Sequence, residues 1–224
     1  MMKRNRKLIL SASCFIGAVI LIILLRVVDV APIGPNNTCV GLSHLNQFVF
    51  NAFGVNMIWY TITDWLGIVA ILTAFLFSVA GLIQLLKRKS ILKVDREILA
   101  LGGLYLIVIG LYVLFENAVV NYRPLIMPDS SQPEASFPSS HTMLVCVIMG
   151  SAVMLTGRYI KNKPLCVLLK VFCALTIGIT VIGRLISGVH WFTDILGGVM
   201  ISAALLSLYS AIAFCNTNQD KYQR

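Results

Sequence analysis

The chain has 224 residues, of which 58% are hydrophobic and only 12% are charged, and its mean hydropathy is +0.87. Soluble domains carry roughly twice this share of charged residues, so the composition excludes a soluble globular protein. The net charge of +9 would suit a nucleic-acid-binding protein, but the positions of the basic residues exclude that class too.

Six segments are long and apolar enough to cross a bilayer, which takes about 20 consecutive apolar residues in a helix. In chain order they are 8–25, 65–86, 98–115, 138–157, 165–182 and 195–214. The first follows a basic N-terminus, as a signal peptide does, but its apolar run is longer and no small-residue cleavage site closes it. The sequence therefore predicts an all-α, polytopic membrane protein with six transmembrane helices, in which residues 1–224 form a single membrane-embedded domain.

The basic residues gather on one side of the predicted spans. They precede the first span, separate the second from the third and the fourth from the fifth, and end the chain: Lys3, Arg4, Arg6, Lys7, Lys87, Arg88, Lys89, Lys93, Arg96, Arg158, Lys161, Lys163, Lys221 and Arg224. Lys170 follows close behind, near the start of the fifth span. The opposite side carries only Arg26, Arg123 and Arg184, and no lysine. Because Lys and Arg are retained on the cytoplasmic side, this bias predicts that both termini are cytoplasmic. The charge thus indicates orientation and contact with anionic lipid headgroups.

The longest outer segment, Val27–Asp64, begins with residues that break helices and continues with apolar residues at helical spacing. The breakers are Pro32, Gly34 and Pro35, and the apolar residues are Leu42, Leu45, Phe48 and Phe53. This stripe predicts a short amphipathic helix, which either lies in the interface of the outer leaflet or packs across the mouth of the bundle. We interpret His44, on its polar side, as an ordinary surface histidine.

The six cysteines do not indicate a disulfide framework. Five of them fall inside or at the ends of predicted spans: Cys14, Cys146, Cys166, Cys173 and Cys215. Cys39 is the one clearly external thiol, so it has no external partner. We therefore interpret the cysteines as small apolar residues.

Three motifs stand at the outer edges of the predicted spans: Arg123-Pro124, Pro138-Ser139-Ser140-His141, and Gly183-Arg184 followed by His190 and Asp194. A helix that begins at Pro138 presents unpaired backbone N–H groups and a positive dipole end to an anion, with two serine hydroxyls beside them. N-capping alone would explain the serines. His141 is harder to explain structurally, because a titratable residue in the first turn of a spanning helix has a desolvation cost.

Arg123 and Arg184 are permanent cations that oppose the charge bias of the outer side. The planar guanidinium matches phosphate oxygens bidentately. Snorkelling to lipid headgroups would explain one of these arginines, and it explains Arg26. Two arginines that flank His141 and His190 in the folded chain favour a bound phosphate.

His190 and Asp194 are four residues apart, so they share a helical face if Gly188 ends the preceding loop and the last span begins near His190. A carboxylate hydrogen-bonded to one imidazole nitrogen fixes the tautomer and leaves the other nitrogen free to attack phosphorus. A metal site is the competing interpretation. Only His141, His190 and Asp194 offer ligands, however, and the arginines would repel a cation. We therefore predict no metal and no other cofactor.

These motifs, in this order, resemble those of the type-2 phosphatidic acid phosphatase superfamily, the integral-membrane lipid phosphate phosphatases. That family carries K-x6-R-P, P-S-G-H and S-R-x5-H-x3-D on a bundle of six helices. The resemblance implies a site at the extracytoplasmic face and a phosphohistidine intermediate. It implies that His190 is the nucleophile, Asp194 its orienting carboxylate and His141 the general acid. The phosphate-binding residues that it implies are Arg123, Arg184, Ser139 and Ser140.

The chain departs from the family pattern at three positions. Gly183 replaces a serine and Ser140 replaces a glycine, and both changes leave a backbone N–H that can donate. Glu116 replaces the phosphate-binding lysine. A carboxylate repels phosphate unless it pairs with a cation. We therefore predict that Glu116 pairs with Arg123, seven residues later on the same helical face, or with Arg184, and that it tunes the choice of substrate.

We predict a multi-pass phosphatase of a bacterial-type plasma membrane that hydrolyses a lipid phosphomonoester or diphosphate. The family's usual substrates are undecaprenyl diphosphate, phosphatidylglycerol phosphate and phosphatidic acid, and the sequence does not choose among them or give an oligomeric state. The expected partners are this substrate and membrane lipids, with no nucleic acid. Two alternatives remain open: a phosphotransferase that passes the phosphoryl group to another lipid, and a catalytically silent member that binds lipid phosphates, which Glu116 favours.

The charge bias predicts that a cysteine introduced at Asp129, in a Cys39→Ser background, reacts with a membrane-impermeant maleimide in intact cells. Both termini and the Lys87–Arg96 loop face the cytoplasm in this topology, so a cysteine at Lys89 should react only after permeabilisation. Labelling of the cysteine at position 129 only after permeabilisation would contradict the topology and the outer position of the site.

Overall fold

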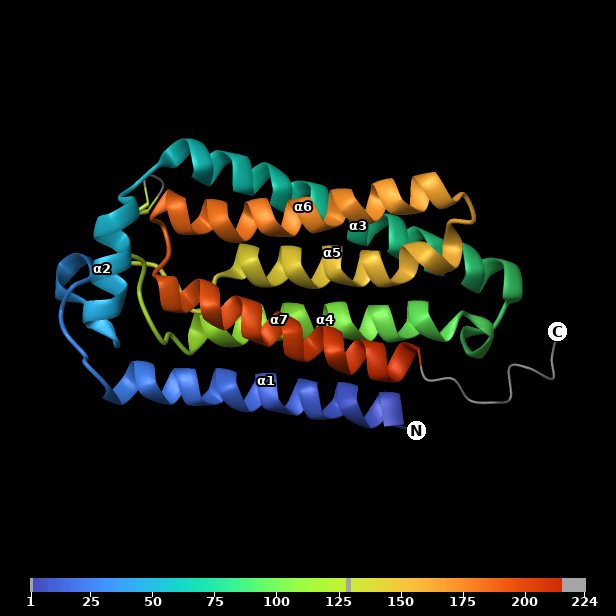
Figure 1. The fold of residues 1–224 in the computed structure, drawn as a ribbon, viewed down its shortest axis with the longest axis horizontal. Helices are drawn as coiled ribbons and strands as arrows, with labels where there is room; N and C mark the ends of the chain where they lie inside the picture. The colour runs from blue at the N-terminus through green and yellow to red at the C-terminus, as the bar shows by residue number, and fades with distance from the viewer. Residues whose placement is uncertain (1, 128–129, 215–224) are drawn as a thin grey trace.

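The computed structural model describes residues 2–127 and 130–214, so Asp129, Cys215, Lys221 and Arg224 lie outside the described residues. In the described part the regular structure is helical, without strands: α1 (Met2–Val27), α2 (Ser43–Phe53), α3 (Met57–Arg88), α4 (Arg96–Asn117), α5 (Ser140–Tyr159), α6 (Lys163–Ser187) and α7 (Phe192–Ala213) (Figure 1). All of these except α2 are long and apolar enough to cross a membrane. The predicted all-α fold and the six predicted spans are therefore confirmed.

Helix α3 begins well before the span predicted to start at Trp65. Asn56 precedes it, and its side-chain oxygen accepts hydrogen bonds from the backbone N–H groups of Ile58 and Trp59 at 3.1 and 3.3 Å. This N-cap satisfies donors that a helix start otherwise leaves unpaired. The first turns carry polar side chains, including Thr63 and Asp64, so a count of apolar residues stops short of them. Asp64 is therefore a helical residue rather than the end of an outer loop.

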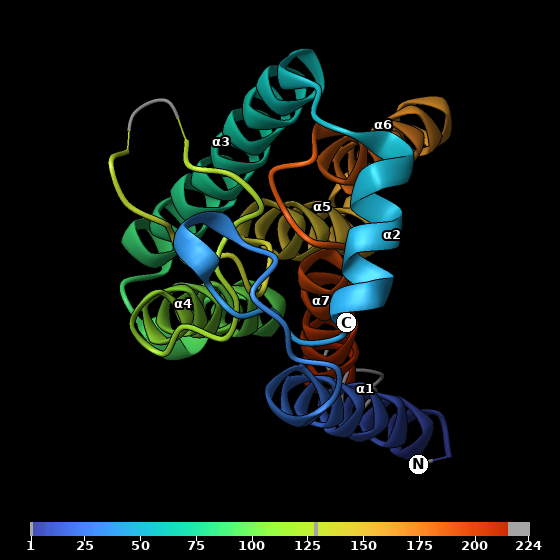
Figure 2. The same ribbon diagram turned by 90° about the vertical axis from the view of Figure 1, so that its left-hand side faces the viewer.

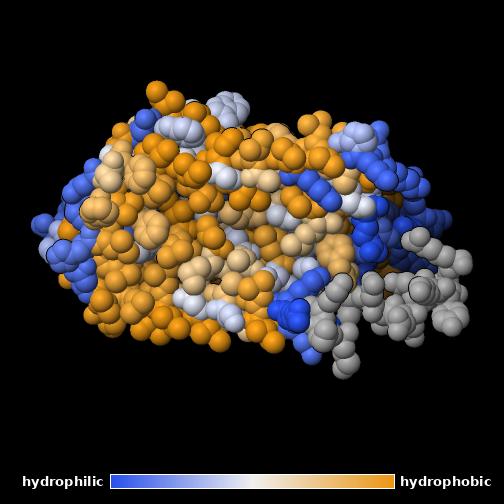
Figure 3. Space-filling model, in the orientation of Figure 1, coloured by the Kyte–Doolittle hydropathy of each residue, from blue (hydrophilic) through white to orange (hydrophobic). Residues whose placement is uncertain are grey.

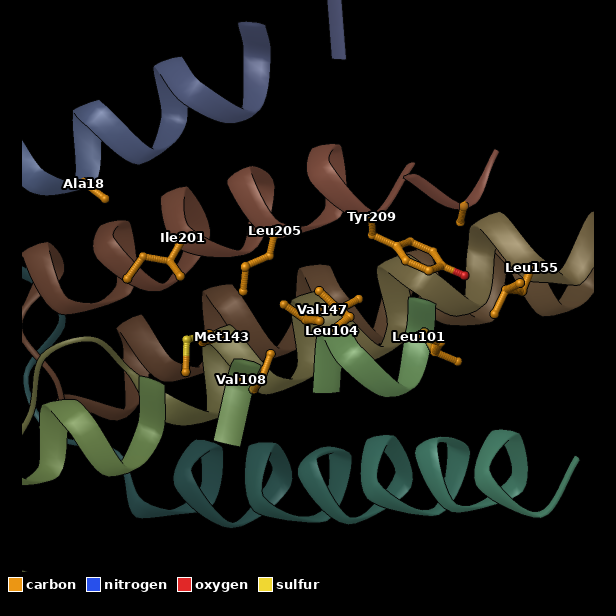
Figure 4. Close-up of a cluster of buried hydrophobic side chains, with 11 residues drawn as sticks. Ala18, Leu101, Leu104, Val108, Met143, Val147, Leu155, Ile201, Leu205 and Tyr209 are labelled. Atoms are coloured by element: carbon orange, nitrogen blue, oxygen red, sulfur yellow. The ribbon is translucent and has the colours of Figure 1, made fainter. Parts of the chain in front are cut away.

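Helix α5 lies at the centre of the bundle and packs against α3, α4, α6 and α7 (Figure 2). One buried cluster joins side chains of α1, α4, α5 and α7: Ala18, Leu101, Leu104, Val108, Met143, Val147, Leu155, Ile201, Leu205 and Tyr209 (Figure 4). Helix α1 packs on the outside of α7. The outer surface is an apolar band between two hydrophilic ends, as a membrane-spanning bundle requires (Figure 3).

Helix α2 confirms the predicted short helix and lies across one end of α6 and α7 (Figures 1 and 2). Its packed face carries Asn46, which is buried and exchanges hydrogen bonds with Thr193 of α7. The apolar stripe faces away, since Phe48 is 73% exposed. Helix α2 therefore packs across the mouth of the bundle through one face, while Leu45, Phe48 and Phe53 on the other face are exposed. His44 is exposed and pairs with Asp29, whose pKa is lowered chiefly by a hydrogen bond from the His44 backbone.

The chain segments that carry the candidate residues meet at the end of the bundle where α2 lies, opposite the start of α1 (Figure 1). There α4 ends, α5 begins after a loop, and α6 turns into α7. Gly188 produces that last turn: its φ of +66° is in the left-handed region, where residues other than glycine are strained. Gly188 thus ends α6 itself rather than a loop, because α6 continues past the predicted end of the span at residue 182.

Helices α3 and α6 approach each other closely at Gly183. A Cβ atom added to Gly183 would lie 2.6 Å from Thr63 Cγ2 and 3.0 Å from Trp59 Cε3. Real Cβ atoms do not approach other atoms to 2.6 Å. The close contact with α3 therefore accounts for glycine at this position, where the family pattern has serine.

Gly183→Ser should destabilise the protein even though it restores the family motif. Forcing apart well-packed helices costs about 1–3 kcal/mol. The measurement is the thermal unfolding temperature of the purified protein in detergent.

Gly178→Ser is the matched control, because it lies on the same helix and an added Cβ there meets no atom within 4 Å. Equal unfolding temperatures for the two variants would show that the α3–α6 contact at Gly183 is not tight.

Candidate active site

A cavity of about 270 Å³ opens at the end of the bundle where the motifs meet. Its polar lining comes from α4, the following loop, the start of α5 and the turn before α7: Glu116, Arg123, Glu134, Ser136, Ser140 and His190. Tyr112 and Phe115 of α4 add aromatic surface. The fold thus brings together residues that the sequence predicted at separate span edges.

His190 is 4% exposed and has one bonded and one unbonded ring nitrogen. Nδ1 lies 3.1 Å from Ser136 Oγ, whereas the buried Nε2 has no hydrogen-bond partner. The Ser136 hydroxyl donates to Asp194, so its oxygen accepts from Nδ1–H, and Nε2 keeps its lone pair. Burial lowers the pKa of His190 well below its ordinary value, and the charges of Arg123 and Arg184 lower it further. The ring is therefore a neutral imidazole at pH 7.

The predicted direct contact between His190 and Asp194 is wrong. Helix α7 begins at Phe192, so His190 precedes it and the two residues do not share a helical face. Asp194 instead turns back over the helix start, where Oδ2 accepts from the Trp191 backbone N–H at 2.9 Å. Ser136 lies between His190 and Asp194, and its hydroxyl donates to the same Asp194 oxygen at 2.5 Å.

Ser136 and Asn121 both donate hydrogen bonds to Asp194 from one loop, and the sequence analysis missed both residues. Asn121 Nδ2 donates to Asp194 Oδ1 at 3.1 Å. The Ser136 backbone N–H donates to the Asn121 carbonyl at 2.9 Å, beside an antiparallel bridge between Tyr122 and Ala135. The loop is thus paired with itself and presents both side chains to one carboxylate. No local sequence signal marks this pairing.

Arg184 on α6 is fully buried and shares a carboxylate with His141. Its Nη2 lies 2.5 Å from Asp64 Oδ1, and His141 Nε2 lies 3.1 Å from the same oxygen. The guanidinium also sits over the ring of Tyr60, 4.9 Å from its centroid. Arg184 Nε and Nη1 have no hydrogen-bond partner. Asp64 is, after Ser136 and Asn121, a third residue that the sequence analysis missed, and here the signal was available: an acidic residue at the edge of an apolar span.

Arg123 pairs with Glu134 rather than with Glu116. Its Nε lies 3.1 Å from Glu134 Oε2, and its backbone N–H donates to the Glu134 carbonyl at 3.0 Å. The predicted pairing of Glu116 with Arg123 or Arg184 is wrong, because α4 ends at Asn117 and the helical face does not continue to Arg123. Glu116 is exposed and lines the cavity, and the structure gives it no ion pair.

The two serines at the start of α5 have different positions. Ser139 is the N-cap residue and is fully buried: its N–H donates to the Asp194 carbonyl and its Oγ accepts from Thr142. Ser140 begins the helix, two residues after the predicted start, and lines the cavity. Ser140 and the helix start are therefore placed to meet an anion, whereas Ser139 lies behind the cavity wall.

A second, more apolar cavity of about 320 Å³ lies beside the first, between α3, α4 and α5. Its apolar lining includes Ile68, Ile71, Val108 and Leu144, and its polar edge carries Asp64 and His141. The two cavities share Tyr112, Ser140 and Met143 as lining residues.

Together the two cavities suit a phosphate attached to an apolar chain. The first offers a neutral imidazole nitrogen without a partner and guanidinium N–H groups that remain unpaired. Among the described residues, no three His, Cys, Asp or Glu side chains are placed to hold a metal ion together. Cationic stabilisation of a phosphate at this site would come from the two arginines.

Comparisons with known proteins give the family and the fold of the chain. The model of the PAP2 superfamily matches residues 40–217. The fold is similar to that of a transmembrane PAP2 type phosphatidylglycerolphosphate phosphatase from Bacillus subtilis, with a TM-score of 0.62 and 18% identity, covering 96% of this chain and 98% of the other. No curated protein matches. The chain therefore belongs to the PAP2 superfamily, and it is a membrane-embedded phosphatase, a hydrolase of phosphoric esters.

Proposed function

We propose that the protein hydrolyses a lipid phosphomonoester or diphosphate through a phosphohistidine on His190. The observation that carries this proposal is the buried Nε2 of His190, which has no partner and keeps its lone pair beside a cavity lined by Arg123. A neutral imidazole can attack phosphorus directly. A histidine serving only structure would be expected to use both ring nitrogens in hydrogen bonds when buried.

The first step forms a bond between His190 Nε2 and phosphorus as the bond from phosphorus to the lipid oxygen breaks. Unpaired N–H groups of Arg123 and Arg184 would stabilise the charge on the phosphoryl oxygens. The proton for the lipid oxygen comes from His141, which lines the adjoining apolar cavity. Water then attacks the phosphohistidine, His141 takes the water's proton, and inorganic phosphate leaves.

The hydrogen-bonded series His190–Ser136–Asp194 supports this step electrostatically. His190 acquires positive charge as it attacks, and the Nδ1–H group polarises the Ser136 hydroxyl toward the Asp194 carboxylate. A buried carboxylate that accepts several hydrogen bonds holds the geometry and stabilises the imidazolium that forms. We therefore assign Asp194 an orienting role that acts through Ser136.

The apolar cavity between α3, α4 and α5 supports a lipid as substrate, since an acyl or prenyl chain can lie there while the phosphate occupies the polar cavity. Phosphatidylglycerol phosphate is one candidate, because the structurally similar Bacillus subtilis protein is a phosphatidylglycerolphosphate phosphatase. Undecaprenyl diphosphate and phosphatidic acid are the others. The charge bias supports an extracytoplasmic site in a bacterial-type plasma membrane.

His190→Ala should abolish phosphate release from lipid phosphates, because it removes the imidazole nitrogen that carries the phosphoryl group in the proposed mechanism. His141→Ala should slow release by roughly two to four orders of magnitude, the usual contribution of a general acid. The measurement is inorganic phosphate released from a panel of lipid phosphates by purified variants. Activity that persists in His190→Ala would contradict the phosphohistidine. Turnover that stops in chelator and returns with Zn²⁺, Mg²⁺ or Mn²⁺ would contradict it as well.

Glu116→Lys should lower KM for simple lipid monophosphates. Glu116 brings an uncompensated negative charge to the cavity that takes the phosphate, and lysine replaces that repulsion with attraction. We expect a change of about tenfold, which corresponds to about 1.4 kcal/mol. Glu116→Gln removes the charge without adding a cation, so its KM should lie between those of the wild type and Glu116→Lys. Total loss of activity with an unchanged unfolding temperature would instead give the carboxylate a specific role, such as contacting a cationic headgroup.

A further inference from the structure

We propose that Asp64 is the positioning residue of the general acid, so that each histidine of the site has its own carboxylate. This inference rests on the function proposed above. Asp194 acts on His190 through Ser136, and Asp64 acts on His141 directly, with 3.1 Å between Asp64 Oδ1 and His141 Nε2. The first carboxylate comes from α7 and the second from α3, so the two histidines are oriented by different parts of the bundle.

The contact with Asp64 determines which nitrogen of His141 can deliver a proton. A carboxylate oxygen only accepts hydrogen bonds, so Nε2 carries a hydrogen in this contact. The proton that leaves is therefore the one on Nδ1, and Asp64 stays ionised against Nε2–H throughout. This arrangement is the same in kind as an aspartate behind the histidine of a hydrolase triad.

The surroundings of Asp64 indicate a functional rather than a purely structural contact. Asp64 lines an apolar cavity and its side chain is 35% exposed, so it is not part of the buried core. A carboxylate at the edge of an apolar surface is costly unless it is paired. Both of its partners, His141 and Arg184, belong to the proposed site. Arg184 is held by one nitrogen, which leaves its Nε and Nη1 unpaired for a phosphate.

His141 gives up one proton in the first half-reaction and regains one in the second. In the first, the His190–phosphorus bond forms, the phosphorus–oxygen bond to the lipid breaks, and the Nδ1 proton of His141 moves to that oxygen to give the lipid alcohol. In the second, a water molecule attacks phosphorus, its proton returns to Nδ1, and the bond between phosphorus and His190 breaks. Asp64 gains and loses no proton in either half.

The test compares two substrates whose leaving groups differ in their need for a proton. Phosphatidic acid releases diacylglycerol, whose alkoxide oxygen must be protonated as it leaves, whereas p-nitrophenyl phosphate releases p-nitrophenolate, which is stable without a proton. Asp64→Asn should lower kcat/KM for phosphatidic acid by roughly tenfold to a hundredfold, within the range of general acid catalysis, and change it little for p-nitrophenyl phosphate. Inhibition by inorganic phosphate should not weaken, because an asparagine side-chain oxygen can still accept a hydrogen bond from Arg184 Nη2 and keep that arginine in place.

The matched control is Asp29→Asn, since Asp29 also pairs with a histidine, His44, but on the outer surface away from the cavities. It should leave both substrates unaffected. In a His141→Ala background, Asp64→Asn should cause no further loss for phosphatidic acid, because residues that act as a unit are not additive. If Asp64→Asn does not fold, Asp64→Glu serves: its displaced carboxylate should still reduce phosphatidic acid hydrolysis selectively.

Equal losses on both substrates in the Asp64 variants, with weaker inhibition by phosphate, would mean that Asp64 only supports the fold, and would overturn the inference alone. An additive loss in the His141→Ala background would overturn it too. If the wild-type protein releases phosphate from neither substrate nor from the other lipid phosphates, the proposed function fails and the inference with it.

Discussion

The end of the bundle that carries the site is organised around one buried carboxylate, that of Asp194. Its Oδ1 accepts a hydrogen bond from Asn121, and its Oδ2 accepts from Ser136 and the Trp191 backbone N–H. The backbone carbonyl of Asp194 accepts from the Ser139 N–H. A buried carboxylate without partners would be too costly to keep. Satisfying this carboxylate therefore brings the loop before α5 to the start of α7, and Ser136 places His190 in the same contacts. The backbone carbonyl of Asp194 adds the start of α5 to this point.

The two arginines are kept in position by ion pairs that satisfy only part of each guanidinium group. Each is paired with a carboxylate, Arg123 with Glu134 of the same loop and Arg184 with Asp64 of α3, and each keeps N–H groups without a hydrogen-bond partner. A fully unpaired buried guanidinium would be strongly unfavourable, and a fully paired one would have nothing left to offer a phosphate. Partial pairing keeps the arginines in place. Arg123 lines the polar cavity, whereas Arg184 is fully buried and is not among the lining residues of either cavity. With Glu116 at the position of the family lysine, the proposed function relies on these two guanidinium groups for positive charge.

The sequence predicted what depends on short stretches of chain and missed what depends on contacts between distant ones. Hydropathy predicted the six spans, and the motifs predicted that His141, His190 and Arg123 meet at one end. The role of Ser136 could not be predicted, because its contact with Asp194 joins residues 58 positions apart. The pairing of Asp64 with Arg184 spans 120 positions. The prediction for Glu116 was wrong because it assumed that α4 continues past Asn117. The chain instead enters a loop there, and Arg123 in that loop pairs with Glu134.

Under the proposed function, the position of His141 explains why the site has two adjoining cavities. His141 lines the apolar cavity, and Tyr112, Ser140 and Met143 form the boundary that this cavity shares with the polar one. A lipid phosphate bound across this boundary has its phosphoryl group beside His190 and its apolar chain between α3 and α4. The bond that breaks is then the one at the boundary, with the nucleophile on the polar side and the general acid on the apolar side. Such a site selects a bond by its position between a phosphate and an apolar chain, which leaves residues at the cavity rim, Glu116 among them, to discriminate between headgroups.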